Sequence, residues 1–213
     1  SRYIYDLMAT RCDLYIAMKQ FSKAIQSAEY GINLVRKFGP SSDSLNQLGY
    51  LYNSIGNAFQ DSVKMVKFPD HHERLDIYAE SFYSKAREYF DSSGNDQALM
   101  TCIGNLAALY ERMGKYKHSQ LINEEGIELY KSLNDPLLKN QLKIFYINHG
   151  TALARQNLFQ EAMNSYSSAL HIISNSRPLN KDLPRINEFY KDCESSLVLL
   201  ASIGRVQLQL AKG

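Results

Sequence analysis

The chain has 213 residues, of which 45% are hydrophobic and 22% charged, so it can bury a core and is not compositionally disordered. Its 24 Lys and Arg residues nearly balance 22 Asp and Glu residues, and the net charge of +2 argues against nucleic-acid binding and against a strongly acidic partner. No apolar run approaches the roughly 20 residues of a membrane helix, and no signal peptide opens the chain. We therefore expect no membrane insertion.

The three cysteines, Cys12, Cys102 and Cys193, are odd in number and far apart. This spacing fits neither a disulfide framework nor a zinc site and is typical of buried thiols in a reducing compartment. We expect an intracellular protein, cytoplasmic or nuclear.

Four stretches carry the same order of features: apolar residues at helical spacing, a short break, a bulky aromatic residue and a second helical stretch. Tyr15 and Phe21 mark the first stretch, and Leu45–Tyr52 begins the second. Ile103–Tyr110 in the third matches Tyr146–Leu153 in the fourth, 43 residues later. This self-similarity indicates a repeat architecture. The repeats are expected at about residues 4–38, 43–91, 96–133 and 136–174.

Helix-breaking residues separate the predicted helices. Gly39 and Pro40 follow the first repeat, and Asp91–Asp96 follows the second. Leu133–Pro136 follows the third and places a proline in the first turn of the next helix.

The second repeat contains an extra stretch, Phe59–Glu73. Pro69 blocks continuation of the preceding helix, and Asp70 with Glu73 predicts a capping box. We expect two over-long helices joined at residues 67–70. They form either a protruding contact arm or merely a lengthened hairpin.

A last helix is expected over residues 185–211, where Ile186, Leu200 and Val206 belong to one apolar stripe. Its sequence matches the first helix of a fifth repeat that lacks its second helix. The segment is either a capping helix or the edge of a longer array. Because Leu208 lies off the stripe, we expect the chain to be a fragment of a longer protein.

These features resemble the tetratricopeptide repeat (TPR) family, in which Leu-Gly and Tyr follow a large residue and the second helix carries Ala, an aromatic residue and Ala-Leu. The 43-residue spacing exceeds the family's usual unit of about 34 residues and is similar to the long repeats of kinesin light chains and the polarity adaptor LGN. The resemblance implies an all-α fold: a right-handed superhelix, or TPR solenoid, of about four helical hairpins plus a C-terminal helix, in a single domain over residues 1–213.

The family pattern also has a packing rationale, since small residues lie where two helices cross closely and large ones fill the gaps beside them. The small residues include Gly49, Ala107, Gly126 and Gly150, and the large ones include Tyr52, Tyr83, Tyr110 and Tyr166.

No catalytic or cofactor motif stands out. The sequence contains no phosphate loop, no GxGxxG motif and no nucleophile elbow. His71 and His72 are adjacent, so on a helix they point in different directions and cannot share a metal. His149 is interpreted as a semi-buried, hydrogen-bonded residue. We expect no enzyme activity, no cofactor and no metal.

By the resemblance, first helices line a groove that binds a partner. Alignment of the repeats then predicts a polar ladder of Thr10, Gln47, Asn105 and Asn148. Primary amides can donate to and accept from a peptide backbone, although asparagines here can also bind a neighbouring helix. Arg112 and Arg155 lie seven residues after the two asparagines and could bind carboxylates, or could simply be solvated. Further candidates are Tyr50, Thr101, Glu111 and Thr151.

Some family members bind acidic C-termini of Hsp70 and Hsp90 through a carboxylate clamp of Lys and Asn. The corresponding positions here hold other residues, including Ala9 and Asp13, so this partner class is not expected. We expect an adaptor or scaffold that holds a peptide or helix of another protein. The alternatives are a structural subunit that packs into a large complex through convex and terminal surfaces, and a ligand-sensing regulatory domain.

Overall fold

The computed structural model describes residues 2–173, 202–207 and 209–211, and every regular element in these ranges is helical. The predicted all-α fold is confirmed. None of the described helices combines the length and the apolar character needed to cross a membrane. In chain order the helices are α1 Arg2–Ala17, α2 Phe21–Arg36, α3 Ser42–Ser62, η1 Val63–Met65, α4 Pro69–Ser93, α5 Asp96–Arg112, α6 Tyr116–Leu133, η2 Pro136–Leu138, α7 Lys139–Arg155 and α8 Phe159–Ile173.

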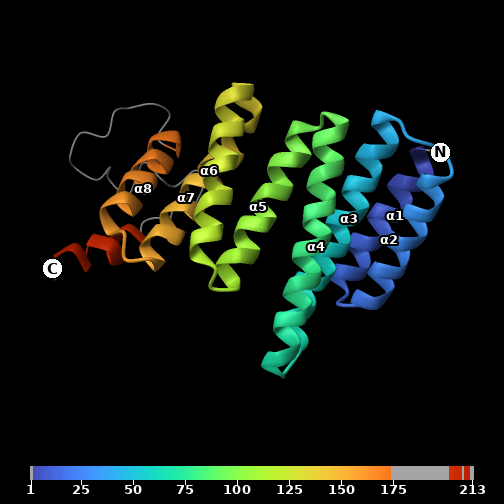
Figure 1. Cartoon of the computed structure of the whole chain (residues 1–213), viewed down its shortest axis with the longest axis horizontal. Coiled ribbons are helices and arrows are strands. Elements are labelled where there is room, and N and C mark those ends of the chain that lie inside the picture. Colours follow the sequence, from blue (N-terminus) through green and yellow to red (C-terminus); the bar gives the residue numbers. More distant parts are fainter. Residues whose placement is uncertain (1, 174–201, 208, 212–213) are drawn as a thin grey trace. The chain divides into compact units, whose positions relative to one another are not determined.

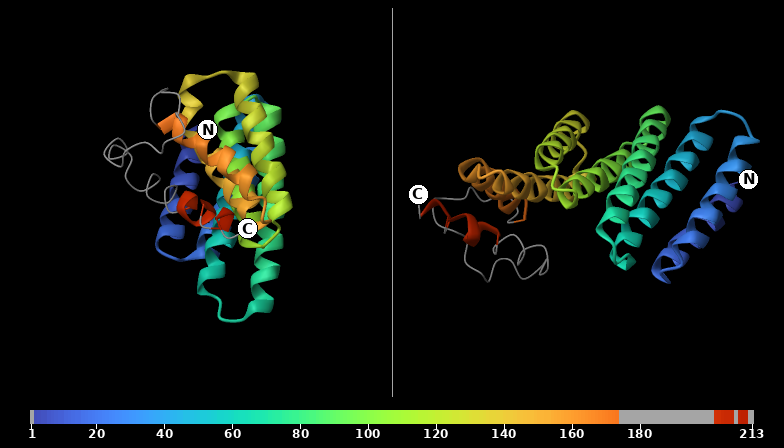
Figure 2. Two further views of the ribbon diagram at one scale, coloured as in Figure 1. Left: turned by 90° about the vertical axis from the view of Figure 1, so that its left-hand side faces the viewer. Right: turned by 60° about the horizontal axis from the view of Figure 1, so that its bottom comes forward.

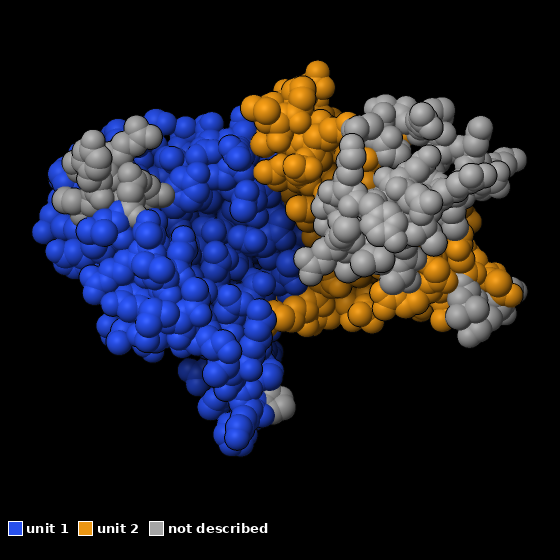
Figure 3. Space-filling model, turned by 180° about the vertical axis from the view of Figure 1, so that it is seen from behind, with its two compact units in different colours: residues 1–109 blue, residues 110–213 orange. Residues whose placement is uncertain are grey.

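The chain divides into two compact units, Ser1–Leu109 and Tyr110–Gly213 (Figure 3). In the first unit, α1 contacts α2 and α3, and α3 also contacts α2 and α4, so each hairpin packs against the next one (Figure 1). In the second unit, α7 contacts both α6 and α8. Sequential helices therefore pack side by side within each unit, as repeats with amphipathic helices require.

The helix ends lie at the breaks that the sequence predicts. Ser41 caps α3 through a reciprocal capping box with Ser44, in which each backbone N–H donates to the other's hydroxyl oxygen, at 3.1 and 2.7 Å. Gly94 ends α4 with φ +71°, and Asn134 ends α6 with φ +49°. Pro136 is the first residue of η2.

Aromatic rings lie directly against glycine backbones at the helix contacts. A Cβ atom added to Gly49 would stand 2.6 Å from the Phe90 ring, and one added to Gly56 would stand 2.6 Å from the Tyr83 ring. No real Cβ comes this close, so only glycine permits these contacts. The expected pairing of small with large residues is confirmed here, and it recurs in the second unit. There the pairs are Gly126 with Phe145 and Gly150 with Tyr166.

The hairpin of α3 and α4 is longer than its neighbour and extends beyond the turn between α1 and α2 (Figures 1 and 2). The prediction of two over-long helices is confirmed. The prediction of a capping box formed by Asp70 and Glu73 is wrong. Phe68 is the N-cap of α4 and makes no side-chain cap bond, because Pro69 already supplies the first helical residue with a suitable φ. His72 Nε2 instead lies 2.8 Å from the Val66 carbonyl oxygen.

A ladder of aromatic rings runs along this hairpin. Tyr52 stacks on Tyr89 with centroids 5.4 Å apart, and Phe59 stacks on Phe82 at 5.5 Å. The Lys85 ammonium lies over the Tyr52 ring at 5.7 Å. Stacked and cationic contacts thus hold α3 and α4 together over much of their length.

The two described cysteines are buried and unpaired, as predicted. Cys12 Sγ donates to the Ala24 carbonyl oxygen at 3.3 Å, and Cys102 Sγ donates to that of Tyr83 at 3.2 Å. Burial raises the pKa of each thiol to about 12. Cys193 lies outside the described residues.

Part of the predicted C-terminal helix is described. Residues 202–207 are helical, and Ile203 and Val206 are buried in a cluster with Leu153 of α7 and with Tyr166 of α8. This segment therefore covers apolar surface of the last hairpin. Residues 185–201 of the predicted helix lie outside the described ranges.

We predict that Gly49→Ala lowers the free energy of unfolding by about 1–3 kcal/mol, because the new methyl group meets the buried Phe90 ring. Urea denaturation followed by circular dichroism measures the change. The control is Gly204→Ala, whose Cβ would meet nothing within 4 Å, and it should be neutral or stabilising. Equal stability of the two variants would contradict this account of the helix contact.

We predict that Cys12 and Cys102 resist alkylation in the folded chain. A pKa of about 12 leaves only about 1 thiol in 10⁴ ionised at pH 8, against roughly a quarter for an ordinary thiol with a pKa of about 8.5. Maleimide labelling of each cysteine, followed by mass spectrometry, should show fast reaction only in urea. Rapid modification of Cys102 in native buffer at pH 8 would contradict the burial.

Candidate functional site

Two predicted groove residues of the first unit lie in different surroundings. Gln47 is only 6% exposed, and its Nε2 donates to Asp43 Oδ2 at 2.9 Å, so its amide is used within α3. Thr10 is exposed on α1. Burial thus leaves Gln47 little surface for a partner, whereas Thr10 stays a prediction.

Asn105 on α5 meets an asparagine of α3 that the sequence pattern did not single out. Asn105 Nδ2 donates to Asn53 Oδ1 at 3.0 Å, and both residues are half-buried. This bond leaves the two hydrogens on Asn53 Nδ2 and the acceptor oxygen of Asn105 available for further hydrogen bonds. A peptide unit carries one C=O and one N–H, which are the complementary groups.

A second amide pair joins the start of α5 to α3. Asn95 Oδ1 accepts from the Ala98 backbone N–H at 3.0 Å and thereby caps α5. Asn95 Nδ2 then donates to Asn46 Oδ1 at 2.7 Å and to the Tyr50 hydroxyl oxygen at 3.3 Å. The cap identifies which side-chain atom of Asn95 is the oxygen, so the other atom, Nδ2, is the donor to Asn46. The Asn46 atom that accepts this bond is therefore its oxygen, and Asn46 Nδ2 remains available for a further hydrogen bond.

Between these two pairs lies a groove of about 170 Å³, formed by residues of α3, α4 and α5. Phe90 is almost fully buried in it, and the Tyr50 ring meets Phe90 edge-on with centroids 5.0 Å apart. Neither the lining nor the amide pairs include a charged side chain. We call this surface the amide groove, and its residues are Asn46, Tyr50, Asn53, Phe90, Asn95, Gln97, Thr101 and Asn105.

The other predicted site residues belong to the second unit. Asn148 is half-buried on α7, and Arg155 is exposed at the end of that helix. Burial raises the pKa of Glu111 above its usual value, and the Arg155 guanidinium partly opposes this effect. Arg112 is exposed at the end of α5. Asn105 and Asn148 belong to different units, so the ladder through both stays a prediction.

Thr151 is used within the last hairpin. Its Oγ1 donates to the Ile147 carbonyl oxygen at 3.0 Å and accepts from the Tyr166 hydroxyl at 3.3 Å. The bond with Tyr166 links α7 to α8, and the two bonds together leave the hydroxyl little freedom to bind a partner.

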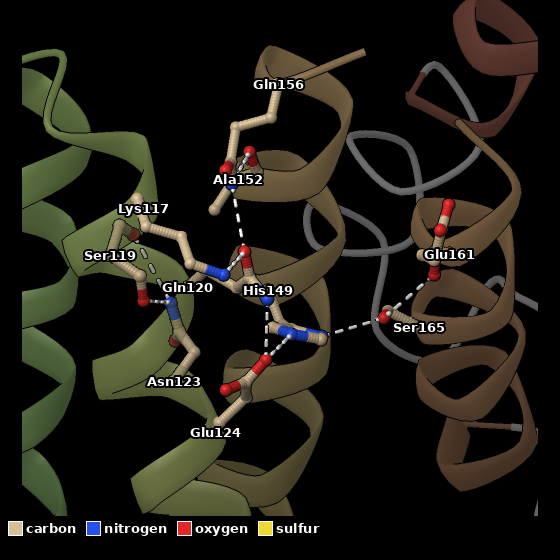
Figure 4. Close-up of polar contacts among 10 residues, drawn as sticks. All are labelled: Lys117, Ser119, Gln120, Asn123, Glu124, His149, Ala152, Gln156, Glu161 and Ser165. Atoms are coloured by element: carbon tan, nitrogen blue, oxygen red, sulfur yellow. Dashed lines mark hydrogen bonds and ion pairs between the residues drawn. The ribbon is translucent and has the colours of Figure 1, made fainter. Parts of the chain in front are cut away.

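A polar network crosses the second unit from α6 to α8 (Figure 4). The two ring nitrogens of His149 lie 2.8 Å from Ser165 Oγ and 3.1 Å from Glu124 Oε1. Gln120 Nε2 also donates to Glu124 Oε1, at 2.7 Å. His149 is therefore a hydrogen-bonded, partly buried residue, as predicted.

The row of serine, histidine and glutamate has the residue types of a hydrolytic triad. Ser165, however, is only 6% exposed, and its hydroxyl donates to the Glu161 carbonyl oxygen at 3.2 Å. We interpret the row as a cross-link that holds three helices together.

The sequence pattern missed Asn46 and Asn53, although a signal was present. Asn46, Tyr50 and Asn53 recur at steps of four and three, which places them on one face of a helix.

In the part of the chain that the structure describes, no three His, Cys, Asp or Glu side chains gather as metal ligands would.

The sequence matches no protein-family model and no curated protein. Among solved structures, the chain is similar to RapI in its apo form, a TPR-like helical-repeat protein, with a TM-score of 0.64 and 13% identity over 82% of this chain and 57% of RapI. It is also similar to BtubC (BKLC) from P. vanneervenii, with a TM-score of 0.65 and 17% identity over 97% of this chain and 80% of BtubC. This likeness shows the fold, a helical repeat, and the chain spans little more than half the length of RapI.

We predict that Glu124→Gln lowers the free energy of unfolding by up to about 1 kcal/mol at pH 7, a modest value because the carboxylate is 43% exposed. Burial alone would raise the pKa of Glu124, but hydrogen bonds from Gln120 and His149 and nearby positive charge hold it below its usual value. A lowered pKa stabilises the fold above the unfolded value near 4.3, and this contribution disappears as the pH falls through the folded pKa.

Urea denaturation at pH 7 and below pH 4 tests this dependence. Wild type and Glu124→Gln should differ at pH 7 and converge in acid, whereas Glu161→Gln on the exposed face of α8 should match wild type throughout. A deficit of Glu124→Gln that grows in acid would refute the assignment.

Proposed function

We propose that the chain is a non-catalytic helical-repeat scaffold that binds a segment of another protein along the first helices of its hairpins. The observation that carries this proposal is the amide groove, where amide side chains on an accessible surface keep donors and acceptors available for hydrogen bonds to a partner. The helical-repeat fold, which the chain shares with RapI, supports a role in protein interaction. Within this proposal the repeats are of the long TPR type, and the buried thiols fit a reducing intracellular compartment.

The chemistry of the amide groove favours an extended, uncharged stretch of polypeptide. Asn53 offers donors to a peptide C=O, and the Asn105 oxygen can accept from a peptide N–H. Tyr50, which is 37% exposed and rests on the buried Phe90 ring, provides aromatic surface for an apolar side chain beside this backbone contact. A carboxylate would find no positive charge among the groove's residues. Thr10 on α1 and Asn148, Arg112 and Arg155 in the second unit are candidates for further contacts with the same segment.

Peptides selected from a display library against the whole chain test the groove. We expect Asn53→Ala to raise their Kd about 30-fold, since two hydrogen bonds of about 1 kcal/mol each are affected. The matched control is Asn33→Ala, which removes an exposed asparagine from the second helix α2 and should leave the Kd unchanged. Equal binding by both variants would refute groove recognition. Loss of binding with Asn33→Ala instead would favour the alternative, a structural subunit that packs through its second helices.

The double variant Asn148→Ala/Arg155→Ala extends this test to the second unit. A weaker Kd with an unchanged urea midpoint would support a segment that continues over α7. Unchanged binding would confine the contact to the first unit.

A further inference from the structure

A second concave site in the first unit lies where the long hairpin overhangs the turn between α1 and α2. It is a pocket of about 250 Å³ formed by three helices. This volume is far above the roughly 10–15 Å³ that one water needs, so the pocket can hold an organic group. Its lining includes Asp13 and Ile16 of α1, Asn57, Gln60 and Asp61 of α3, and Tyr83 of α4.

The helix lengths explain the pocket. α1 ends at Ala17, whereas α3 continues to Ser62, and the hairpin of α3 and α4 then extends further (Figures 1 and 2). The last turns of α3 therefore form a wall beside the end of α1. A hairpin of ordinary length would have no such wall.

The polar lining of the pocket is rich in acceptor oxygens. The Tyr83 hydroxyl lies 2.7 Å from Asn57 Oδ1 and 2.8 Å from Gln60 Oε1, but it has one hydrogen and can donate to only one of these oxygens at a time. Tyr83 is only 1% exposed, and its ring is held against Gly56, so the hydroxyl cannot turn away. Each amide oxygen has two acceptor sites, so both side chains keep acceptor capacity for a ligand.

The two carboxylates add further acceptor oxygens. Asp13 is exposed at the mouth of the pocket, yet partial burial of its carboxyl group raises its pKa. None of the ion pairs among the described residues includes Asp13. Asp61 has an ion pair with Lys64 at 2.6 Å, but that lysine side chain is 73% exposed and three residues away on the same segment. A surface-exposed pair of this kind is weak and easily exchanged.

We propose that this pocket binds the guanidinium or ammonium group of an arginine or lysine in the segment that the scaffold holds. This inference rests on the proposed function. Both groups carry only donors, which matches a lining of carboxylate and amide oxygens. The methylene stem of such a side chain can pack on Ile16 and Ala17 while its charged end reaches Asp13.

The pocket and the amide groove are joined by one stripe of polar residues on α3. Asn53 belongs to the groove and Asn57 to the pocket, one helical turn or about 6 Å apart. An extended peptide advances about 3.3 Å per residue, so a basic residue about two to four positions from the backbone contact would reach the pocket. The stripe consists of Asn46, Tyr50, Asn53, Asn57 and Gln60.

A pair of small probes tests the pocket without any partner. N-acetyl-arginine N-methylamide and its neutral counterpart, the citrulline derivative, are titrated into the whole chain, and the side-chain amide signals of Asn57 and Gln60 are followed by NMR. We expect saturable shifts with the arginine probe and at least tenfold weaker binding of citrulline. The lysine derivative shows whether an ammonium group serves as well.

Variants complete the test. Asp13→Asn should weaken arginine binding at least tenfold, whereas Asp91→Asn, which neutralises an exposed aspartate near the other end of α4, should leave it unchanged. Equal binding of arginine and citrulline, or of wild type and Asp13→Asn, would overturn the proposal. Selected peptides that depend on Asn53 but show no preference for Arg or Lys would overturn it too, while leaving the groove intact. Probe binding that persists when no peptide depends on Asn53 would reject the groove alone.

Discussion

An aromatic ring packed against a glycine backbone is the contact on which both surfaces of the first unit depend. Gly49 and Gly56 are seven residues apart on α3, and their partners, Phe90 and Tyr83, are seven apart on α4. The equal spacing on two antiparallel helices fixes how one helix lies along the other. It also fixes the rings themselves. Phe90 contributes to the amide groove, and Tyr83 directs its hydroxyl into the pocket at the overhang. The packing that holds the hairpin together thus also shapes the two surfaces that we propose for binding.

The two units use polar side chains in different ways. In the second unit, hydrogen bonds across three helices join Glu124, His149 and Ser165. These side chains therefore form their hydrogen bonds within the fold. In the first unit, Asn53 and Asn105 bond only once to each other and keep further donors and acceptors. A network in which every polar group is hydrogen-bonded stabilises a particular packing of the helices. Polar groups on an accessible surface that keep free donors or acceptors are available to a ligand. This difference explains why we place the binding site on the first unit.

Periodicity and local signals were sufficient to predict the helices, their breaks and the long hairpin, because apolar spacing and residues such as Gly94 act over only a few positions.

The proposed binding surface was harder to predict from the sequence. Repeat alignment identified Asn105, but its partner Asn53 depends on the offset between two neighbouring first helices, which no single repeat encodes. The same alignment equated Gln47 with Asn105, yet Asp43, one turn earlier, takes the Gln47 amide. At the start of α4, Pro69 outweighed the capping signal of Asp70.

The added length of α3 and α4 has a consequence for how such a protein can change over evolution. Whole turns added at the tip of a hairpin leave the earlier glycine and ring contacts in place, because those contacts lie nearer its base. A lineage could therefore lengthen or trim one hairpin and gain or lose a recognition feature without redesigning the interior. Diversity in hairpin length, more than diversity in buried sequence, would then distinguish relatives that select different ligands.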